Sequence, residues 1–168
     1  MTNPNDKFTI ASLFNRAIAI EYTVCSIYKN FSKLFSHAPE ISAFWEQMTD
    51  DEKIHAKTLK EILNSLTEEQ LAEPPDKKIY DQINQIEIFF KKNIIDGIKN
   101  LDDAYELAHE IEHSEINSIF QFLTIGHIHS EKRKMMISSE IINHQQKLSH
   151  FSKNFGDKTW REGIMIQQ

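Results

Sequence analysis

Apolar side chains recur every three or four residues along most of the chain, the spacing typical of amphipathic helices. Helix-breaking residues separate the stripes, among them Pro39, the Pro74-Pro75 pair, Gly126 and Gly156. The pattern predicts four long helices, over about residues 9–36, 40–66, 101–124 and 131–155. A shorter stripe predicts a further helix over about residues 77–95, which closes near Asp96-Gly97.

The lengths of the connections predict how these helices are arranged. Short gaps join the first two helices and the last two, which favours antiparallel hairpins, whereas a long crossover separates the two pairs. Two hairpins joined by a long crossover are typical of a ferritin-like four-helix bundle. The sequence therefore predicts an all-α protein with one ferritin-like domain over residues 1–168, and it gives no prediction for the structure of residues 157–168.

The composition excludes several other classes of protein. With 4 Gly and 4 Pro among 168 residues, the chain has too few turn-forming residues for a β-sandwich or barrel. A net charge of −6 argues against a nucleic-acid partner. One cysteine excludes a disulfide framework, a cysteine-based zinc site and a rubredoxin-type iron centre. No apolar run approaches about 18 residues and no signal-peptide pattern opens the chain, so we expect a cytoplasmic protein without a membrane segment.

Ionisable residues interrupt each apolar stripe near the middle of its helix. They are Glu21 in the first helix, Glu52 and His55 in the second, Glu112 and Glu115 in the third, and Glu140 and His144 in the fourth. Mid-helix positions of an antiparallel bundle lie at one level, so these side chains are predicted to meet in the core.

Five carboxylates at one level of a core need compensating charge. Burying a single bare carboxylate costs several kcal/mol even after relaxation, and a domain has only about 5–15 kcal/mol of net stability. Lysine and arginine lie mostly off these stripes, as at Lys29, Lys53, Lys57 and Lys60. Two divalent cations would bring the site close to neutrality, and hard oxygen ligands with two imidazoles suit iron or manganese, with zinc possible.

The spacing of the candidate ligands supports a metal site. Glu52 and His55 form a Glu-x-x-His pair, and in ferritin-like di-iron proteins two helices carry such a pair while the other two each carry one Glu. Glu140 and His144 are four residues apart rather than three, which still places both on one helix face. The two hairpins also resemble a repeat, because 34 residues separate Glu21 from His55 and 32 separate Glu112 from His144.

At these positions the chain resembles the rubrerythrin family. The similar segments are Ile20-Glu21 followed by Tyr28, residues 51–56 around Glu52 and His55, and Glu112-His113-Ser114-Glu115, which is close to the family's Glu-His-Thr-Glu segment. The resemblance covers roughly residues 9–66 and 101–155. It implies a carboxylate-bridged pair of iron ions.

The resemblance also implies a role for each ligand. Glu52 and Glu140 would bridge the ions, Glu21 and His55 would complete one ion, and Glu112, Glu115 and His144 would serve the other. The third helix carries two candidate glutamate ligands, Glu112 and Glu115. In the resemblance, this additional glutamate favours redox catalysis over iron storage. Family members typically reduce hydrogen peroxide, so the expected substrate is peroxide or oxygen.

Two further expectations concern electrons and radicals. Because the chain has one cysteine, it lacks a four-cysteine rubredoxin domain, and electrons would come from an external donor. Tyr28 and Tyr105 each lie seven residues from a proposed ligand, so they could hydrogen-bond a ligand carboxylate or quench a stray radical, although core packing is the alternative. A homodimer is expected.

Other interpretations stay open at this point. A ferroxidase or iron-handling protein would use the same ligands, and a structural bundle could retain only a vestigial site. Glu112 and Glu115 could belong to a solvated acidic face, and Glu140 with His144 fits the bridging pattern least well. Asp51 lies four residues before His55 and could hydrogen-bond it.

Overall fold

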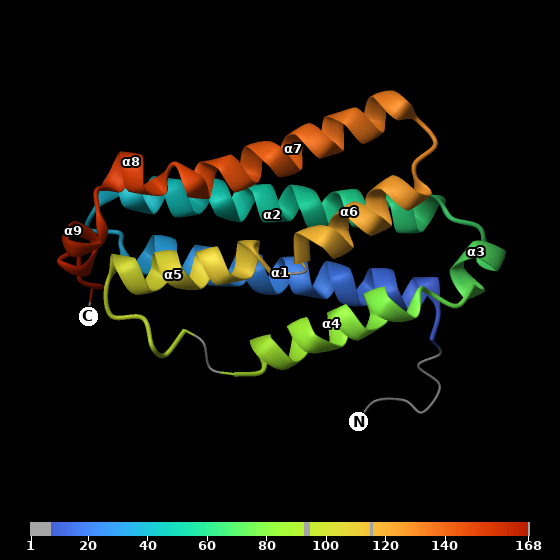
Figure 1. Ribbon diagram of the computed structural model, residues 1–168, viewed down its shortest axis with the longest axis horizontal. Coiled ribbons are helices and arrows are strands. Elements are labelled where there is room, and N and C mark those ends of the chain that lie inside the picture. Colours follow the sequence, from blue (N-terminus) through green and yellow to red (C-terminus); the bar gives the residue numbers. More distant parts are fainter. Residues whose placement is uncertain (1–7, 93–94, 115, 168) are drawn as a thin grey trace.

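The computed structural model describes residues 8–92, 95–114 and 116–167. The regular structure in these ranges is helical (Figure 1), as the sequence predicts for an all-α, ferritin-like bundle. The helices are α1 Ile10–Leu34, α2 Pro39–Ser65, α3 Glu68–Ala72, α4 Lys77–Phe90, α5 Leu101–Glu112, α6 Ile116–His127, α7 Glu131–Ser149, α8 Phe151–Phe155 and α9 Lys158–Glu162.

The first hairpin consists of α1 and α2, two unbroken helices that pack along their length. Thr9 begins α1 by accepting a hydrogen bond from the Ser12 amide, and Pro39 begins α2 at a position where its missing N–H costs nothing. Phe35 is fully buried in the short turn between the two helices. Both helices confirm the predicted ranges within a few residues.

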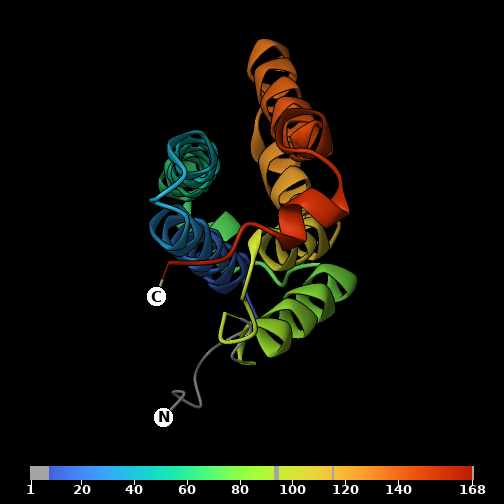
Figure 2. The same ribbon diagram turned by 90° about the vertical axis from the view of Figure 1, so that its left-hand side faces the viewer.

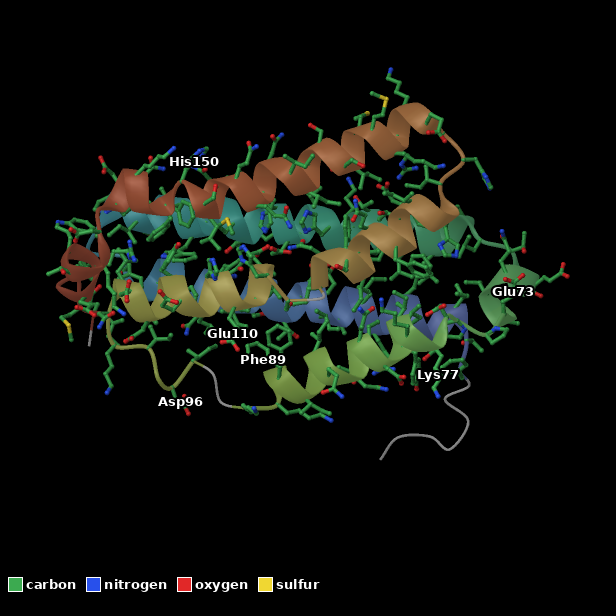
Figure 3. All side chains as sticks on the ribbon, viewed as in Figure 1. Glu73, Lys77, Phe89, Asp96, Glu110 and His150 are labelled. Carbon is green, nitrogen blue, oxygen red and sulfur yellow. The ribbon has the colours of Figure 1, made fainter. Side chains whose placement is uncertain are left out.

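The crossover between the hairpins contains α3 and α4. The sequence did not predict α3, a single turn that a capping box at Thr67 and Gln70 stabilises. The predicted crossover helix is present as α4, which follows the N-cap Asp76 and packs against α1 and α6, but it ends at Phe90 rather than near residue 95. Phe89 of α4 and Glu110 of α5 border a cavity of about 240 Å³ between those two helices (Figure 3).

The third predicted helix is not continuous, which corrects the predicted range of 101–124. It divides into α5, which ends at Glu112, and α6, which begins at Ile116 and runs through Gly126 to His127. At the junction, side chains take the place of backbone N–H groups as hydrogen-bond donors to the helix carbonyls. Ser114 donates to the Ile111 carbonyl, and Asn117 donates to the Glu112 carbonyl. Such local side-chain bonds compete with helical backbone bonds and account for the break.

The fourth predicted helix is also divided, into α7 and α8, although its predicted end at Phe155 before Gly156 is confirmed. Gly156 has a positive φ of 78°, a conformation that favours glycine. Viewed along the bundle, α1 and α2 form one side and α5 to α8 the other, with α4 outside them (Figure 2). The second hairpin is thus built from shorter pieces than the first.

The segment after Gly156 ties the two hairpins together at one end of the bundle. The Ile164 carbonyl accepts a hydrogen bond from the backbone N–H of Leu101 at the start of α5. The backbone N–H of Gln167 donates to the Leu34 carbonyl at the end of α1. Arg161 of α9 forms a buried ion pair with Asp102, with both N···O distances 2.8 Å. These contacts fix the start of α5 relative to α1.

Helix α1 meets the length and composition that a membrane-spanning helix needs, the one described helix that does so. Its most apolar window is 56% buried inside the bundle, and Glu21 lies in the middle of the helix with 2% of its surface exposed. These features are those of a core helix. The expected cytoplasmic location stays a prediction.

Candidate metal centre

Five of the seven predicted ligands converge in the middle of the bundle. They form two groups, Glu21 with Glu52 and His55, and Glu52 with Glu112 and His144. In each group the candidate ligand atoms lie within 4.8 Å of one another, and all five side chains are buried. Glu52 belongs to both groups.

The first group is built entirely on the first hairpin. His55 Nδ1 lies 3.1 Å from Glu52 Oε2 and 3.9 Å from Glu21 Oε2. The i, i+3 spacing of Glu52 and His55 places both on the face of α2 that packs against α1, where Glu21 interrupts the apolar stripe. The ring of Phe120 packs against the His55 imidazole from α6, with 4.6 Å between the ring centroids.

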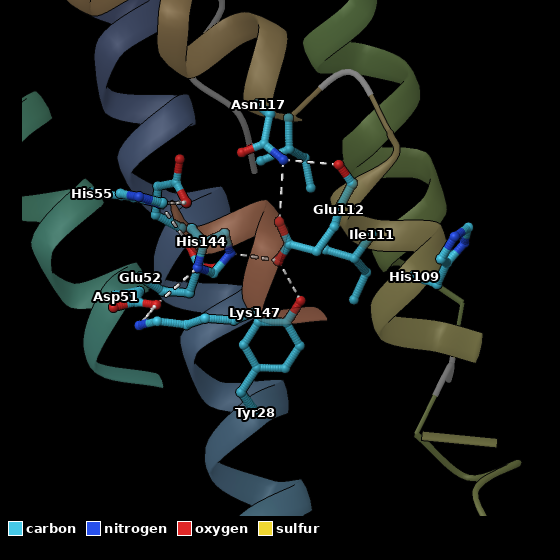
Figure 4. Close-up of polar contacts among 12 residues, drawn as sticks. Tyr28, Asp51, Glu52, His55, His109, Ile111, Glu112, Asn117, His144 and Lys147 are labelled. Atoms are coloured by element: carbon cyan, nitrogen blue, oxygen red, sulfur yellow. Dashed lines mark hydrogen bonds and ion pairs between the residues drawn. The ribbon is translucent and has the colours of Figure 1, made fainter. Parts of the chain in front are cut away.

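The second group joins α2, α5 and α7. His144 Nε2 lies 3.0 Å from Glu52 Oε1 and 2.9 Å from Glu112 Oε1 (Figure 4). The two oxygens of Glu52 therefore face different groups, Oε2 toward His55 and Oε1 toward His144. This is the arrangement expected of a bridging carboxylate.

Hydrogen bonds from outside the two groups orient Glu112 and His144. Tyr28 donates to Glu112 Oε1 at 2.6 Å, and Asn117 donates to Glu112 Oε2 at 3.1 Å (Figure 4). His144 Nδ1 contacts Asp51 Oδ2 at 3.0 Å, which leaves Nε2 to face the carboxylates. A carboxylate on the far nitrogen of a ligating histidine fixes its tautomer and orientation.

Burial and neighbouring charges shift the pKa values of the carboxyl groups. Burial raises the pKa of Glu21 well above its ordinary value, and the carboxylates of Glu52 and Glu112 raise it further. Burial also acts to raise the pKa of Glu52, but the contacts with His144 and His55 outweigh it, so its pKa lies below the ordinary value.

The pKa of His144 is shifted in the opposite sense to that of Glu52. Burial lowers the pKa of His144, but Asp51, Glu112 and Glu52 together raise it well above its ordinary value. Burial, followed by the Glu112 carboxylate, raises the pKa of Tyr28 well above its ordinary value, so Tyr28 is a neutral phenol that donates its proton to Glu112. Without a cation, the centre thus favours a protonated His144 and a protonated Glu21.

The donor set fits a pair of divalent cations. Glu21 Oε2 and His144 Nε2 are buried and lack a hydrogen bond of good geometry, although buried polar atoms are rarely left without one. A cation in the first group would contact Glu21 Oε2, and a cation in the second group would contact His144 Nε2. Together the two cations would offset the charge of the three buried carboxylates. Carboxylate oxygens together with imidazole nitrogens suit iron, manganese or zinc.

A cleft of about 230 Å³ lies between α2 and α7 beside the two groups. Its lining residues are Asp51, Ile54, His55, Glu140, Asn143, His144 and Lys147. It borders both histidines, so a small molecule in the cleft would lie next to one ligand of each group. The five candidate ligands are buried, and the cleft is an opening beside them through which a small molecule would approach.

Two of the predicted ligands are not placed in either group. Glu140 is exposed on α7 and lines the cleft, so a bridging role for it would require a different position of its side chain. Glu140 and His144 both line the cleft, but Glu140 is exposed whereas His144 is buried against Glu52 and Glu112. Glu115 lies outside the described residues, and its role as a ligand stays a prediction.

The two predicted tyrosines differ in position. Tyr28 contacts the centre directly through Glu112. Tyr105 is half-buried at the end of the bundle, where its ring stacks on Phe151 and lies under the Arg161 guanidinium. Tyr105 therefore has no direct contact with the described ligands.

The sequence pattern did not reveal how three further residues support the centre. Its spacing along the helix would allow Asp51 to hydrogen-bond His55, but Asp51 contacts His144 instead, and Lys147 adds a 2.6 Å ion pair to the same carboxylate. Adjacent residues of a helix point in different directions, which allows Asp51 to reach α7 while Glu52 faces the core. Asn117 gave no signal in the sequence, because it reaches Glu112 only through the break between α5 and α6.

A helical bundle with two carboxylate and histidine groups that share one glutamate defines the class of ferritin-like proteins with a two-metal centre. A family model described as Rubrerythrin matches residues 13–149, and the chain belongs to the rubrerythrin family. The match confirms the resemblance inferred from the sequence motifs. No curated protein and no solved structure matches the chain.

Proposed function

We propose that the chain is a di-iron oxidoreductase of rubrerythrin type, which reduces hydrogen peroxide to water with electrons from an external donor. The observation that supports it most directly is the position of Glu52, whose two oxygens face two separate ligand groups. Membership of the rubrerythrin family favours iron as the metal in both groups. Zinc would fit the ligands but could not supply electrons.

Two ferrous ions would each supply one electron, and peroxide takes up two electrons and two protons to give two water molecules. The part of the protein is to hold the ions at the right separation and to exclude competing reactions. Glu52 would hold both ions through its two oxygens, while Asp51 and Tyr28 orient His144 and Glu112. The cleft between α2 and α7 would admit peroxide beside His55 and His144.

The decisive experiment measures metal content and peroxide consumption on the same samples. Protein reconstituted with ferrous iron without oxygen should hold about two ions per chain, as a bundle of this class does. It should then consume peroxide with a chemical electron donor faster than free iron at the same concentration. Glu52→Ala should lose both properties, whereas Glu106→Gln, an exposed glutamate of α5, should retain both.

Two results would overturn the proposal in favour of an alternative. Rapid oxidation of ferrous iron by oxygen, with assembly into a large shell in size-exclusion chromatography, would indicate a ferroxidase or storage protein rather than the expected homodimer. Metal content near zero in carefully reconstituted protein would indicate a vestigial site.

A further inference from the structure

A continuous chain of aromatic rings connects the metal centre with the end of the bundle. It begins at Tyr28, whose hydroxyl donates to Glu112 Oε1 at 2.6 Å. The Tyr28 ring stacks on Trp45 at a centroid distance of 5.7 Å, and Trp45 contacts Phe151 at 5.5 Å. Phe151 in turn stacks on Tyr105 at 5.1 Å. The two tyrosines singled out from the sequence are thus the two ends of one array.

The composition of this array favours electron transfer as well as packing. Tyrosine and tryptophan are the side chains that lose one electron most easily, and close ring contacts favour transfer between them. We infer that Tyr105, Trp45 and Tyr28 form an electron relay, with Phe151 as the packed ring across which the electron passes from Tyr105 to Trp45 without Phe151 itself being oxidised. The relay supplies one electron to the metal centre when only one of the two metal ions can give one. This inference rests on the proposed function, because the peroxide chemistry creates the demand for that electron.

The environment of Trp45 suits an intermediate in the relay rather than an end point. Trp45 is fully buried, and its Nε1 atom makes no hydrogen bond. A tryptophan without a proton acceptor passes an electron on without passing a proton. Trp45 would therefore be oxidised only briefly and would be restored by the next donor in the array.

The environment of Tyr105 suits the donor end. Tyr105 is half-buried, whereas Phe151, Trp45 and Tyr28 are fully buried, so it is the member of the array nearest to solvent. The Arg161 guanidinium lies 4.4 Å from the centre of the Tyr105 ring. A positive charge over the ring disfavours a cationic radical, so loss of an electron from Tyr105 would be accompanied by loss of the proton.

The electrons and protons of the step balance. Tyr105 gives one electron through Phe151, Trp45 and Tyr28, and it gives its phenolic proton to solvent. Together with one electron from a ferrous ion and two protons from solvent, this electron reduces peroxide to two water molecules. The neutral Tyr105 radical that remains is reduced by a small thiol or ascorbate-type reductant. No hydroxyl radical is released inside the bundle.

The first test does not need metal or peroxide. The chain has two tryptophans, and Trp160 is exposed, so Trp160→Phe leaves Trp45 as the one tryptophan. A laser flash at the red edge of the tryptophan absorption, where tyrosine does not absorb, then photo-ionises Trp45. In this variant the Trp45 radical should decay while a tyrosyl radical forms, as followed by transient absorption. With Tyr28→Phe added, the tyrosyl radical should still form, and further addition of Tyr105→Phe should remove it and prolong the Trp45 radical. A Trp45 radical with the same lifetime with and without Tyr105→Phe would overturn the relay.

The second test follows the relay during peroxide treatment. Protein with one ferrous ion per chain is treated with peroxide and a spin trap, and the trapped position is located by mass spectrometry. Wild type and Trp160→Phe should carry the label on Tyr105, whereas Trp45→Phe and Phe151→Leu should lose it. Equal labelling of Tyr105 in all four proteins would show that the radical reaches it by another route, and the relay would be wrong.

The two tests separate the relay from the proposed function. If the protein bound no metal, the proposed function would fail while the flash experiment still tested the array. If the protein reduced peroxide but the flash experiment gave no tyrosyl radical, the relay would fail and the proposed function would remain.

Discussion

The two hairpins contribute to the metal centre in different ways. The first hairpin consists of two unbroken helices of 25 and 27 residues, and it supplies Glu21, Glu52 and His55. The second hairpin is divided between α5 and α6 and again after α7, and its described residues supply Glu112 and His144. In the first hairpin, regular helix geometry alone brings the ligands together.

The second group depends on side chains that reach across from the first hairpin. Tyr28 of α1 orients Glu112, and Asp51 of α2 orients His144. The first hairpin thus acts as a template on which the second group is positioned. This difference predicts that a substitution in the second hairpin affects one group, whereas the first hairpin contains Glu52, the one described residue whose substitution affects both groups directly.

The largest expected effect follows from Glu52→Ala. Since Glu52 faces both groups, its removal should abolish binding of both ions, as measured by elemental analysis after reconstitution. Glu112→Ala removes a ligand from the second group alone and should leave one ion bound. Equal metal loss in the two variants would contradict the distinction between the hairpins.

A smaller effect is expected from Asp51→Asn. Removing a carboxylate that orients a ligating histidine typically lowers metal affinity by about 10–100-fold. Competition with a chromogenic chelator should show weaker binding of one ion and unchanged binding of the other. The matched control is Asp50→Asn, the neighbouring aspartate, which is exposed and pairs with Lys53 at the surface. If both ions weakened, Asp51 would act on the whole centre rather than on His144.

The pH dependence of stability should differ between the metal-free and the metal-bound protein. In the metal-free protein the pKa values of His144 and Glu21 are raised, so the folded state binds more protons than the unfolded state and stability falls as pH rises. The His144 contribution is fully present below its unfolded pKa of about 6.5 and is lost at higher pH.

Metal binding reverses this trend because the ligands must be deprotonated. The Tm difference between metal-bound and metal-free protein should therefore widen between about pH 6 and pH 8, as measured by calorimetry. In Glu52→Ala the added metal should produce little change in Tm at any pH. A difference that narrowed as pH rose would contradict the assignment of Glu21 and His144 as ligands.

The smallest effect is expected at the junction of α5 and α6. Asn117→Ala removes two hydrogen bonds to Glu112, a net loss of about 1 kcal/mol each. Chemical denaturation should show this loss, and binding of the second ion should weaken slightly. Ser118→Ala, at the exposed next position, should change neither property.

Much of the fold could be predicted because it depends on local pattern. The stripes of α1 and α2 predict both helices closely, and the Glu-x-x-His spacing of Glu52 and His55 identifies the first group. The break after Glu112 could not be predicted, since it depends on how Ser114 and Asn117 bond to nearby carbonyls rather than on apolar periodicity.

Contacts between distant parts of the chain were also beyond the reach of the sequence pattern. Asp51 and His144 are 93 residues apart, and their contact depends on how α7 lies against α2. The exposure of Glu140 also depends on how α7 lies against α2. Periodicity places Glu140 near the buried stripe, but a cleft separates the two helices at that point and Glu140 lines it. Helix spacing identifies which faces meet, but it does not fix how closely they approach.

The shared carboxylate of Glu52 has a consequence for the order in which cations bind. The first cation to arrive would fix the Glu52 side chain and neutralise part of the local repulsion, so the second would find an organised ligand at lower entropic cost. Occupancy of the first position would then favour occupancy of the second, and a titration with metal would give a second binding constant higher than that of an independent site.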